Sequence, residues 1–216
     1  EMYRVYEAQQ DLLGEIYKTL VNDWKAENLQ LRHFKTPLAS RNLSNDIPDS
    51  AVEALLTVCM NNAPIFQRYF SLKAKLCKIR TMNRYHIYAP HRAEQKTYRY
   101  ADAVRMVLDA YYGFSPRLAE LAQRVFADRH IDARTKPGKM GGAYCYSVAP
   151  NLTPYVMLNF TGEARDIATM AHELGHAVHA MMAEQHNVFT FHSTLPLAET
   201  ASVFGERILS DALMAS

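Results

Sequence analysis

The sequence lacks the features that mark several specialised classes of protein. Its formal net charge is only +2, and no basic run with interleaved aromatic residues argues for nucleic-acid binding. No stretch of about 18 uninterrupted apolar residues predicts a membrane span. The three cysteines, Cys59, Cys77 and Cys145, are odd in number and form no C-x-x-C pair. We therefore expect small buried thiols in a reducing compartment rather than a disulfide framework.

The composition that remains is that of an ordinary globular protein. The 216 residues are 49% hydrophobic and 21% charged, which is enough apolar sequence for a sizeable core. The chain starts at Glu1, already inside a helical pattern. It stops at Ser216, a few residues after an unfinished helical pattern. We therefore expect a fragment of a longer protein.

The first part of the chain, residues 1–130, is predicted to be helical. Apolar residues at helical spacing and helix start signals give the predicted helices 2–31, 51–60, 65–77, 98–111 and 115–127. Pro48 fits the first turn of the helix that includes 51–60, and Pro64 interrupts the helical pattern before 65–77. Ser115-Pro116 is the start signal of the helix 115–127. Residues 41–50 are predicted to be a loop. Residues 79–97 are predicted to be irregular, with an extended piece at 85–88 before Pro90.

The pattern changes in the second part, residues 131–216. Two short β-type runs, 143–148 and 155–160, flank Pro150 to Pro154 and predict a hairpin. A long helix is predicted from about residue 163 to 184, and a last one from about 197 to the end. We expect this part to form a metal-binding subdomain for the following reason.

Residues 172–176 read His-Glu-Leu-Gly-His. Two histidines four positions apart on a helix share one face, about 6 Å apart along the axis, and can bind one Zn²⁺. Glu173 between them can reach a metal-bound water. It is also the only formal charge from Ile167 to Ala183, so the helix should be largely buried, and its polar side chains need partners. A metal would be one such partner. The alternative is a metal-free network of satisfied His and Glu side chains.

A catalytic zinc usually has three protein ligands and one open position. Glu199, at the start of the last helix, is the best candidate for the third ligand, because an antiparallel return helix would carry it to the histidines. It could instead be a solvated carboxylate favoured by the helix dipole. Glu206, two turns further, either orients a metal ligand or lies on the surface. His179 is either a substrate-side or supporting residue or merely a packed histidine.

These residues resemble a known family. The stretch 172–179, His-Glu-Leu-Gly-His-Ala-Val-His, is similar to the H-E-x-G-H-x-x-H of thimet-type oligopeptidases. Glu199-Thr200-Ala201-Ser202, with Glu206, is similar to that family's downstream E-x-x-S-x-x-x-E. The glycine-rich stretch 138–145 resembles a strand segment of the oligoendopeptidase F branch, and further similarity at 36–38, 69–75 and 154–160 extends the resemblance to essentially the whole chain.

The resemblance implies a mainly α fold, a multi-helical zincin-like metallopeptidase segment with a small β-hairpin or antiparallel sheet next to the active-site helix. It implies a cytoplasmic zinc endopeptidase that cleaves short peptides inside a channel, with one Zn²⁺ per chain and no nucleic-acid or membrane partner. Gly141, Gly142, Ala143 and Tyr144 would pair with the substrate backbone. The family's oxyanion-stabilising His and Tyr residues come well after the metal ligands. We therefore expect them beyond Ser216, and we expect this chain to need the missing remainder of its own polypeptide.

The expected mechanism follows from these parts. Zinc held by His172, His176 and Glu199 lowers the pKa of its water and polarises the scissile carbonyl, while Glu173 takes the water proton and delivers it to the leaving amine.

Two alternative functions stay open. One is a non-catalytic zinc-binding helical module. The other is a different HExxH hydrolase, such as a deformylase, in which Cys145 would be the third ligand.

Overall fold

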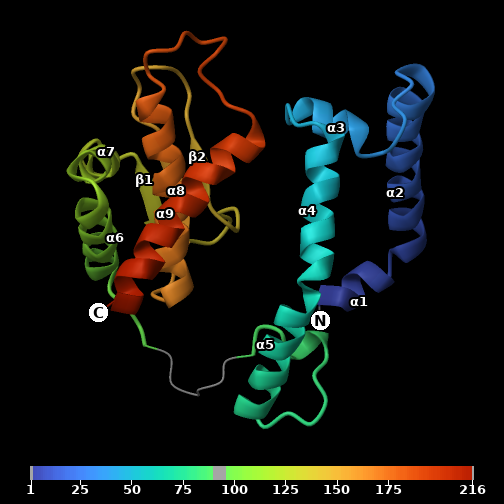
Figure 1. The fold of residues 1–216 in the computed structure, drawn as a ribbon, viewed down its shortest axis with the longest axis horizontal. Helices are drawn as coiled ribbons and strands as arrows, with labels where there is room; N and C mark the ends of the chain where they lie inside the picture. Colours follow the sequence, from blue (N-terminus) through green and yellow to red (C-terminus); the bar gives the residue numbers. More distant parts are fainter. Residues whose placement is uncertain (1, 90–95, 216) are drawn as a thin grey trace. The chain divides into compact units, whose positions relative to one another are not determined.

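The structure is a computed structural model that describes residues 2–89 and 96–215 (Figure 1). The chain forms two compact units, Glu1–Ser71 and Leu72–Ser216. The predicted boundary at residue 130 lies inside the second unit, directly before its first strand. Among the described helices, none is both long enough and apolar enough to cross a membrane.

The first unit is helical, as the apolar spacing predicts. Its elements are α1 (Met2–Glu7), α2 (Gln10–Lys25) with a π-type extension at Ala26–Leu31, α3 (Ala39–Ser44), α4 (Asp49–Asn61) and the beginning of α5 (Ala63–Leu76). Pro48 immediately precedes α4, and Pro64 stands in the first turn of α5. The helices α2, α4 and α5 bury none of their residues, so their apolar stripes stay largely exposed among the described residues.

Two local predictions in the first half are wrong. The predicted loop at 41–50 overlaps α3, because the buried Asn42 donates from Nδ2 to Asp49 Oδ1 at 2.8 Å and ties α3 to the start of α4. The predicted extended piece at 85–88 instead begins with a short 3₁₀ helix, Arg84–His86. Asn83 caps it by accepting from the Tyr85 amide at 3.0 Å, and the Asn83 amide lies 3.1 Å from His86 Nδ1. Pro90 lies outside the described residues.

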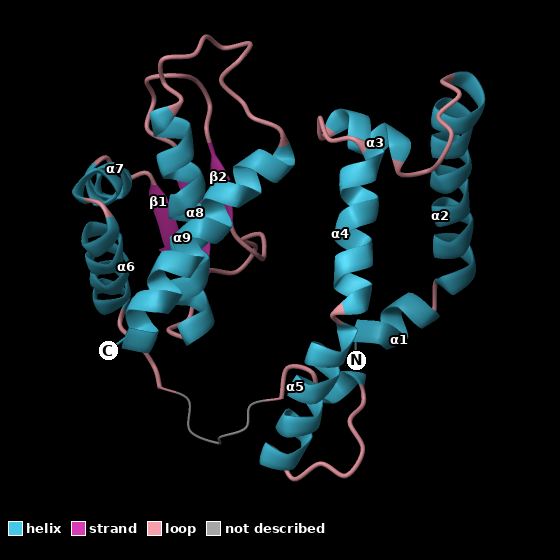
Figure 2. Ribbon diagram, viewed as in Figure 1, coloured by secondary structure: helices cyan, strands magenta, loops and turns pink. Residues whose placement is uncertain are grey.

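The second unit is built on four longer helices. They are α6 (Tyr100–Phe114), α7 (Pro116–Ala127), α8 (Ala164–Met182) and α9 (Leu195–Ala215), close to the predicted ranges. The core lies among these helices and the inner face of the sheet, and its largest fully buried side chains include Val107, Tyr111, Val125, Ile167, Met170 and Leu174. Helix α8 is central, because it packs on the sheet and on each of the other three helices (Figure 2).

The sheet has three strands in the order β1-β3-β2. The predicted hairpin is confirmed, since β2 (Tyr144–Tyr146) pairs antiparallel with β3 (Tyr155–Phe160). Strand β1 (Ile131–Arg134) was not predicted, and it adds to β3 in parallel. The four residues of β1 are too short a run to stand out, and half of them are charged. Strand β2 is left at an edge of the sheet.

Helices α8 and α9 approach each other very closely at two glycines. A Cβ atom on Gly175 of α8 would lie 2.7 Å from the Ala201 carbonyl oxygen and 2.8 Å from Ser202 Cα, both in the backbone of α9. A Cβ on Gly205 of α9 would collide with the Tyr111 hydroxyl and lie 2.8 Å from the Ala171 carbonyl oxygen of α8. The Tyr111 hydroxyl itself donates to that oxygen at 2.6 Å. Only glycine at 175 and 205 permits this spacing.

We predict that Gly175→Ala destabilises the protein by about 1–3 kcal/mol, because the added methyl group must push α9 backbone aside. Alanine by itself is the better helix former, by about 0.5–1 kcal/mol. Gly113→Ala in α6 is the matched control, since nothing lies within 4 Å of its Cβ position. Urea denaturation should show a loss for Gly175→Ala and no loss for Gly113→Ala. Equal stability of the two variants would contradict the close crossing.

Candidate metal centre

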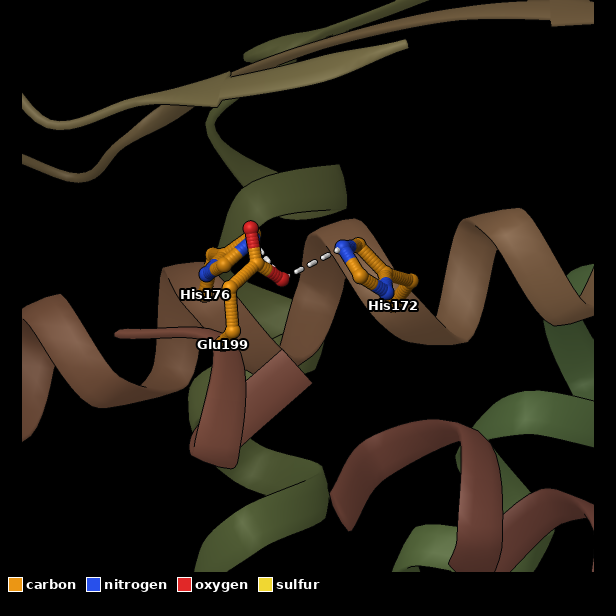
Figure 3. A group of neighbouring side chains, drawn as sticks. All are labelled: His172, His176 and Glu199. Carbon is orange, nitrogen blue, oxygen red and sulfur yellow. Dashed lines mark ion pairs between the residues drawn. The ribbon is translucent and has the colours of Figure 1, made fainter. Parts of the chain in front are cut away.

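Three side chains from α8 and α9 converge on one point (Figure 3). His172 and His176 lie one turn apart on α8, and Glu199 stands in the second turn of α9. Glu199 Oε2 is 3.4 Å from His172 Nε2 and 3.7 Å from His176 Nε2. Ligand atoms of the three residues all lie within 4.8 Å of one another. The structure thus brings together the three residues that the sequence singles out as metal ligands.

The spacing of these atoms fits a tetrahedral metal. With metal–ligand bonds of about 2.0–2.1 Å, two ligands of a tetrahedral zinc lie about 3.3–3.4 Å apart. The two nitrogen–oxygen distances, 3.4 and 3.7 Å, are at or slightly above that value. Two imidazoles and one carboxylate are also a donor set that catalytic zinc sites use. The residues present therefore fit a zinc ion by geometry and by chemistry.

A second layer of contacts orients these side chains. His172 Nδ1 lies 2.6 Å from Glu206 Oε1, which leaves Nε2 free to face Glu199. The fully buried Ser202 donates its hydroxyl to Glu199 Oε2 at 2.8 Å. Hydrogen bonds to ligand side chains fix their orientation, and the tautomer of a histidine, in metal sites. Of the two readings of Glu206, the contact favours orientation of a ligand over a free surface position.

Burial shifts the protonation of the central groups toward their neutral forms. Glu173 is 5% exposed, and its pKa is raised to about 7 in all: burial is the largest cause and Glu199 and Glu206 add to it, whereas His172 and a backbone hydrogen bond from Cys145 oppose it. Burial, together with the neighbouring His172, lowers the pKa of His176. A neutral imidazole is the form that binds a metal.

The cysteines behave differently from one another. Cys59 and Cys145 are free thiols. The prediction of buried thiols is wrong for Cys59, which is exposed because α4 buries no side chain. Cys77 and Cys145 are partly buried, and burial raises the pKa of Cys145 to about 12. Cys145 is absent from the converging group of ligand atoms, which contains Glu199 instead.

Two cavities flank the converging side chains. The first, of about 510 Å³, is lined by Gly142, Ala143, His172, Glu173 and Glu206, among others. The second, of about 330 Å³, includes Cys145, Tyr146, His176, His179 and Glu199 in its lining. Of the predicted substrate-binding residues, Gly142, Ala143 and His179 therefore line cavities at the site. Gly141 and Tyr144 line neither of these two, although Tyr144 begins the edge strand β2.

Two residues that sequence reasoning missed hold the glycine-rich segment in place. The Lys139 side chain is 5% exposed, and its Nζ donates to the carbonyl oxygens of Asp132, Arg134 and Leu158 at 2.9, 3.0 and 2.6 Å. Asn159 Nδ2 donates to the carbonyl oxygens of Met140 and Gly142, both at 2.9 Å. These bonds anchor one wall of the first cavity to β1 and β3. No sequence pattern distinguishes Lys139 from an exposed lysine.

The fold and this site define a mainly helical segment with a candidate metal centre, and comparisons with known proteins give its family. All 216 residues match the sequence profile of peptidase family M3. The chain is 26% identical to the group B oligopeptidase PepB of Streptococcus agalactiae over 99% of its length, and 26% identical to the chromosomal oligoendopeptidase F of Lactococcus lactis over 91%. The chain belongs to peptidase family M3. It spans about a third of the length of these relatives, 35% and 33% respectively.

Solved structures share the fold. PZ peptidase A, solved with an inhibitor, superposes with a TM-score of 0.82 at 20% identity, over 98% of this chain and 39% of that one. A Bacillus anthracis structure described as an oligoendopeptidase F gives a TM-score of 0.82 at 19% identity, over 98% of this chain and 40% of that one. The predicted mainly α fold class is therefore confirmed, with a mixed three-stranded sheet in place of a purely antiparallel one.

We predict that Lys139→Met lowers the free energy of unfolding by about 1–3 kcal/mol, because it removes the donor from three backbone carbonyls that face a buried side chain. It should also speed hydrogen exchange at the amides of 140–143. Lys136→Met is the control: Lys136 is 61% exposed, and its only ion pair is a 3.6 Å contact with Asp132, worth little at a surface. Equal effects of the two substitutions would contradict the anchoring role of Lys139.

Proposed function

We propose that this chain is the metal-binding and catalytic segment of a zinc-dependent endopeptidase that hydrolyses short peptides. The observation that carries the proposal is the convergence of His172, His176 and Glu199 at tetrahedral spacing, beside the buried carboxyl group of Glu173. Membership of peptidase family M3 supports a peptidase, and the relatives named as oligopeptidases support short peptides as substrates.

His172, His176 and Glu199 would hold one Zn²⁺ per chain. When bound there, zinc acidifies a water molecule and polarises the scissile carbonyl group of the substrate. Glu206 would keep His172 in the required tautomer, and Ser202 would hold the Glu199 carboxylate in position.

Glu173 is the proposed general base. It stands between the two histidines on α8, and burial places its pKa at about 7. A carboxyl group with a pKa near the working pH can both accept a proton from the attacking water and return it to the leaving amine. No other carboxylate in α8 lies so close to the ligands, since Asp166 is bound to the amides of Thr161, Gly162 and Glu163.

The substrate backbone would pair with the segment from Gly141 to Tyr144 and with the free edge of β2, as an added strand does. Gly142 and Ala143 line the first cavity beside Glu173, and His179 lines the second. Because the chain spans about a third of its relatives, we propose that oxyanion-stabilising groups come from the rest of the polypeptide, beyond Ser216. A cytoplasmic location stays a prediction.

We predict two classes of variant in the complete encoded protein. His172→Ala, His176→Ala and Glu199→Ala should lose tightly bound zinc, because each removes a ligand. Glu173→Gln should keep one zinc per chain, yet lose peptidase activity by about 10²–10⁴-fold, because it removes only the base. Elemental analysis of purified protein measures the first effect, and cleavage of a quenched fluorescent peptide measures the second.

His179→Ala is the control for zinc content, since His179 lies outside the converging group. Glu120→Gln on the exposed face of α7 is the control for activity. Wild-type protein without zinc after zinc-replete expression would overturn the proposal. One zinc per chain without turnover of any peptide would favour a non-catalytic zinc-binding module, and normal turnover by Glu173→Gln would remove Glu173 from the role of base.

A further inference from the structure

Arg165 lies in the first turn of α8 and lines the same cavity as His172 and Glu173. Seven residues, or nearly two helical turns, separate it from His172, so both project from one face about 10 Å apart along the axis. Ala168 and Thr169 line the cavity between them. One cavity therefore extends from His172, a proposed zinc ligand, to Arg165.

Arg165 is the only Lys or Arg among the described residues that line this cavity. The three carboxylates of the lining have other partners or another role. Asp166 Oδ2 accepts bonds from the Thr161 hydroxyl and from three backbone amides, Glu206 contacts His172, and Glu173 is the proposed base. Within residues 2–89 and 96–215, no carboxylate makes an ion pair with Arg165. Arg165 is exposed, and it also borders a smaller pocket with Lys96 and Glu163, so its side chain is accessible to an anion bound at the first cavity.

The run of the chain indicates which end of a peptide enters this cavity. Gly142 and Ala143, just before β2, line the first cavity, whereas Cys145 and Tyr146 line the second. Strand β2 and helix α8 therefore run in the same direction, from the first cavity to the second. A peptide added antiparallel to the edge of β2, the commoner pairing, places the residues that follow its cleaved bond in the first cavity.

Spacing then sets which residue meets Arg165. An extended peptide advances about 3.3 Å per residue, so the 10 Å between His172 and Arg165 corresponds to about three residues. The long arginine side chain can reach back along the cavity by part of that distance. The second or third residue after the cleaved bond lies within its range.

We propose that Arg165 is a specificity-determining residue that binds a peptide carboxylate two or three residues beyond the cleaved bond. This inference rests on the proposed function and specifies which short peptides the proposed enzyme would prefer. The carboxylate can be the free C-terminus of a short peptide or the side chain of Asp or Glu, because a guanidinium group binds both in the same bidentate way.

The test uses the complete encoded protein loaded with zinc, and peptides whose cleavage point is first mapped by mass spectrometry. One peptide pair ends three residues after the cleaved bond, as a free acid or as a carboxamide. A second pair is longer and amidated, and carries Glu or Gln at the second or third position. Competition between the members of each pair gives the ratio of their kcat/KM values. The variants are Arg165→Gln, Arg165→Lys and the control Lys96→Gln, which removes a nearby cation that does not line the cavity.

We expect the wild type to prefer the carboxylate by about ten-fold in at least one pair, a modest factor because Arg165 is exposed. Arg165→Gln should bring that ratio close to one, Arg165→Lys should retain part of it, and Lys96→Gln should leave it unchanged. The pair that responds identifies the source of the carboxylate. Higher salt should reduce the wild-type preference, since an exposed charge pair is screened.

A wild-type ratio near one in both pairs, or a ratio that survives Arg165→Gln, overturns the role of Arg165 while peptide cleavage itself stands. No cleavage of any peptide by the zinc-loaded wild type contradicts the proposed function, and the inference falls with it. These two results are distinct, because the first is read from a ratio of rates and the second from the absence of turnover.

Discussion

Helices α8 and α9 cross in contact at Gly175 and Gly205, and the candidate metal centre depends on that contact. With any side chain at either position, the backbones would have to separate. Glu199 and Glu206 both project from α9, and each meets a histidine of α8 over 2.6–3.7 Å. A shift of one ångström between the helices would break these contacts together. The packing of two backbones thus determines whether three ligand atoms can reach one ion.

The sheet supplies the other side of the site. Lys139 ties the glycine-rich segment to carbonyl oxygens of β1 and β3, and Asn159 holds the segment's own carbonyl oxygens at Met140 and Gly142. Strand β2 covers Glu173 and gives it a backbone hydrogen bond through Cys145. Burial on this side raises the pKa of Glu173 to about 7. The wall that would seat a peptide strand in the proposed function thus also tunes the proposed base.

Sequence reasoning predicted the parts of this arrangement that local rules control. Helical periodicity and the Ser115-Pro116 signal located the helices, and the i, i+4 spacing placed His172 and His176 on one face. Glu199 could be predicted because a return helix antiparallel to the first carries it to the histidines. The rest depends on tertiary contacts. Strand β1 forms because β3 lies beside it and pairs with it. Helix α3 forms because Asn42 reaches Asp49. Lys139 is buried because three carbonyl oxygens accept its hydrogen bonds. The apolar stripes of the first unit predicted helices correctly, but α2 and α4 bury none of their residues in the described part of the chain.

The central claim is that α8 and α9 together build a zinc site, and diffraction from crystals of the zinc-loaded protein tests it most directly. Anomalous difference maps at the zinc absorption edge should show one peak per chain, about 2.0–2.2 Å from His172 Nε2, His176 Nε2 and a Glu199 carboxylate oxygen. The Glu206 carboxylate should remain on His172 Nδ1, outside the coordination sphere. A peak elsewhere, a peak that Glu199 does not contact, or no peak from zinc-replete crystals would contradict the account.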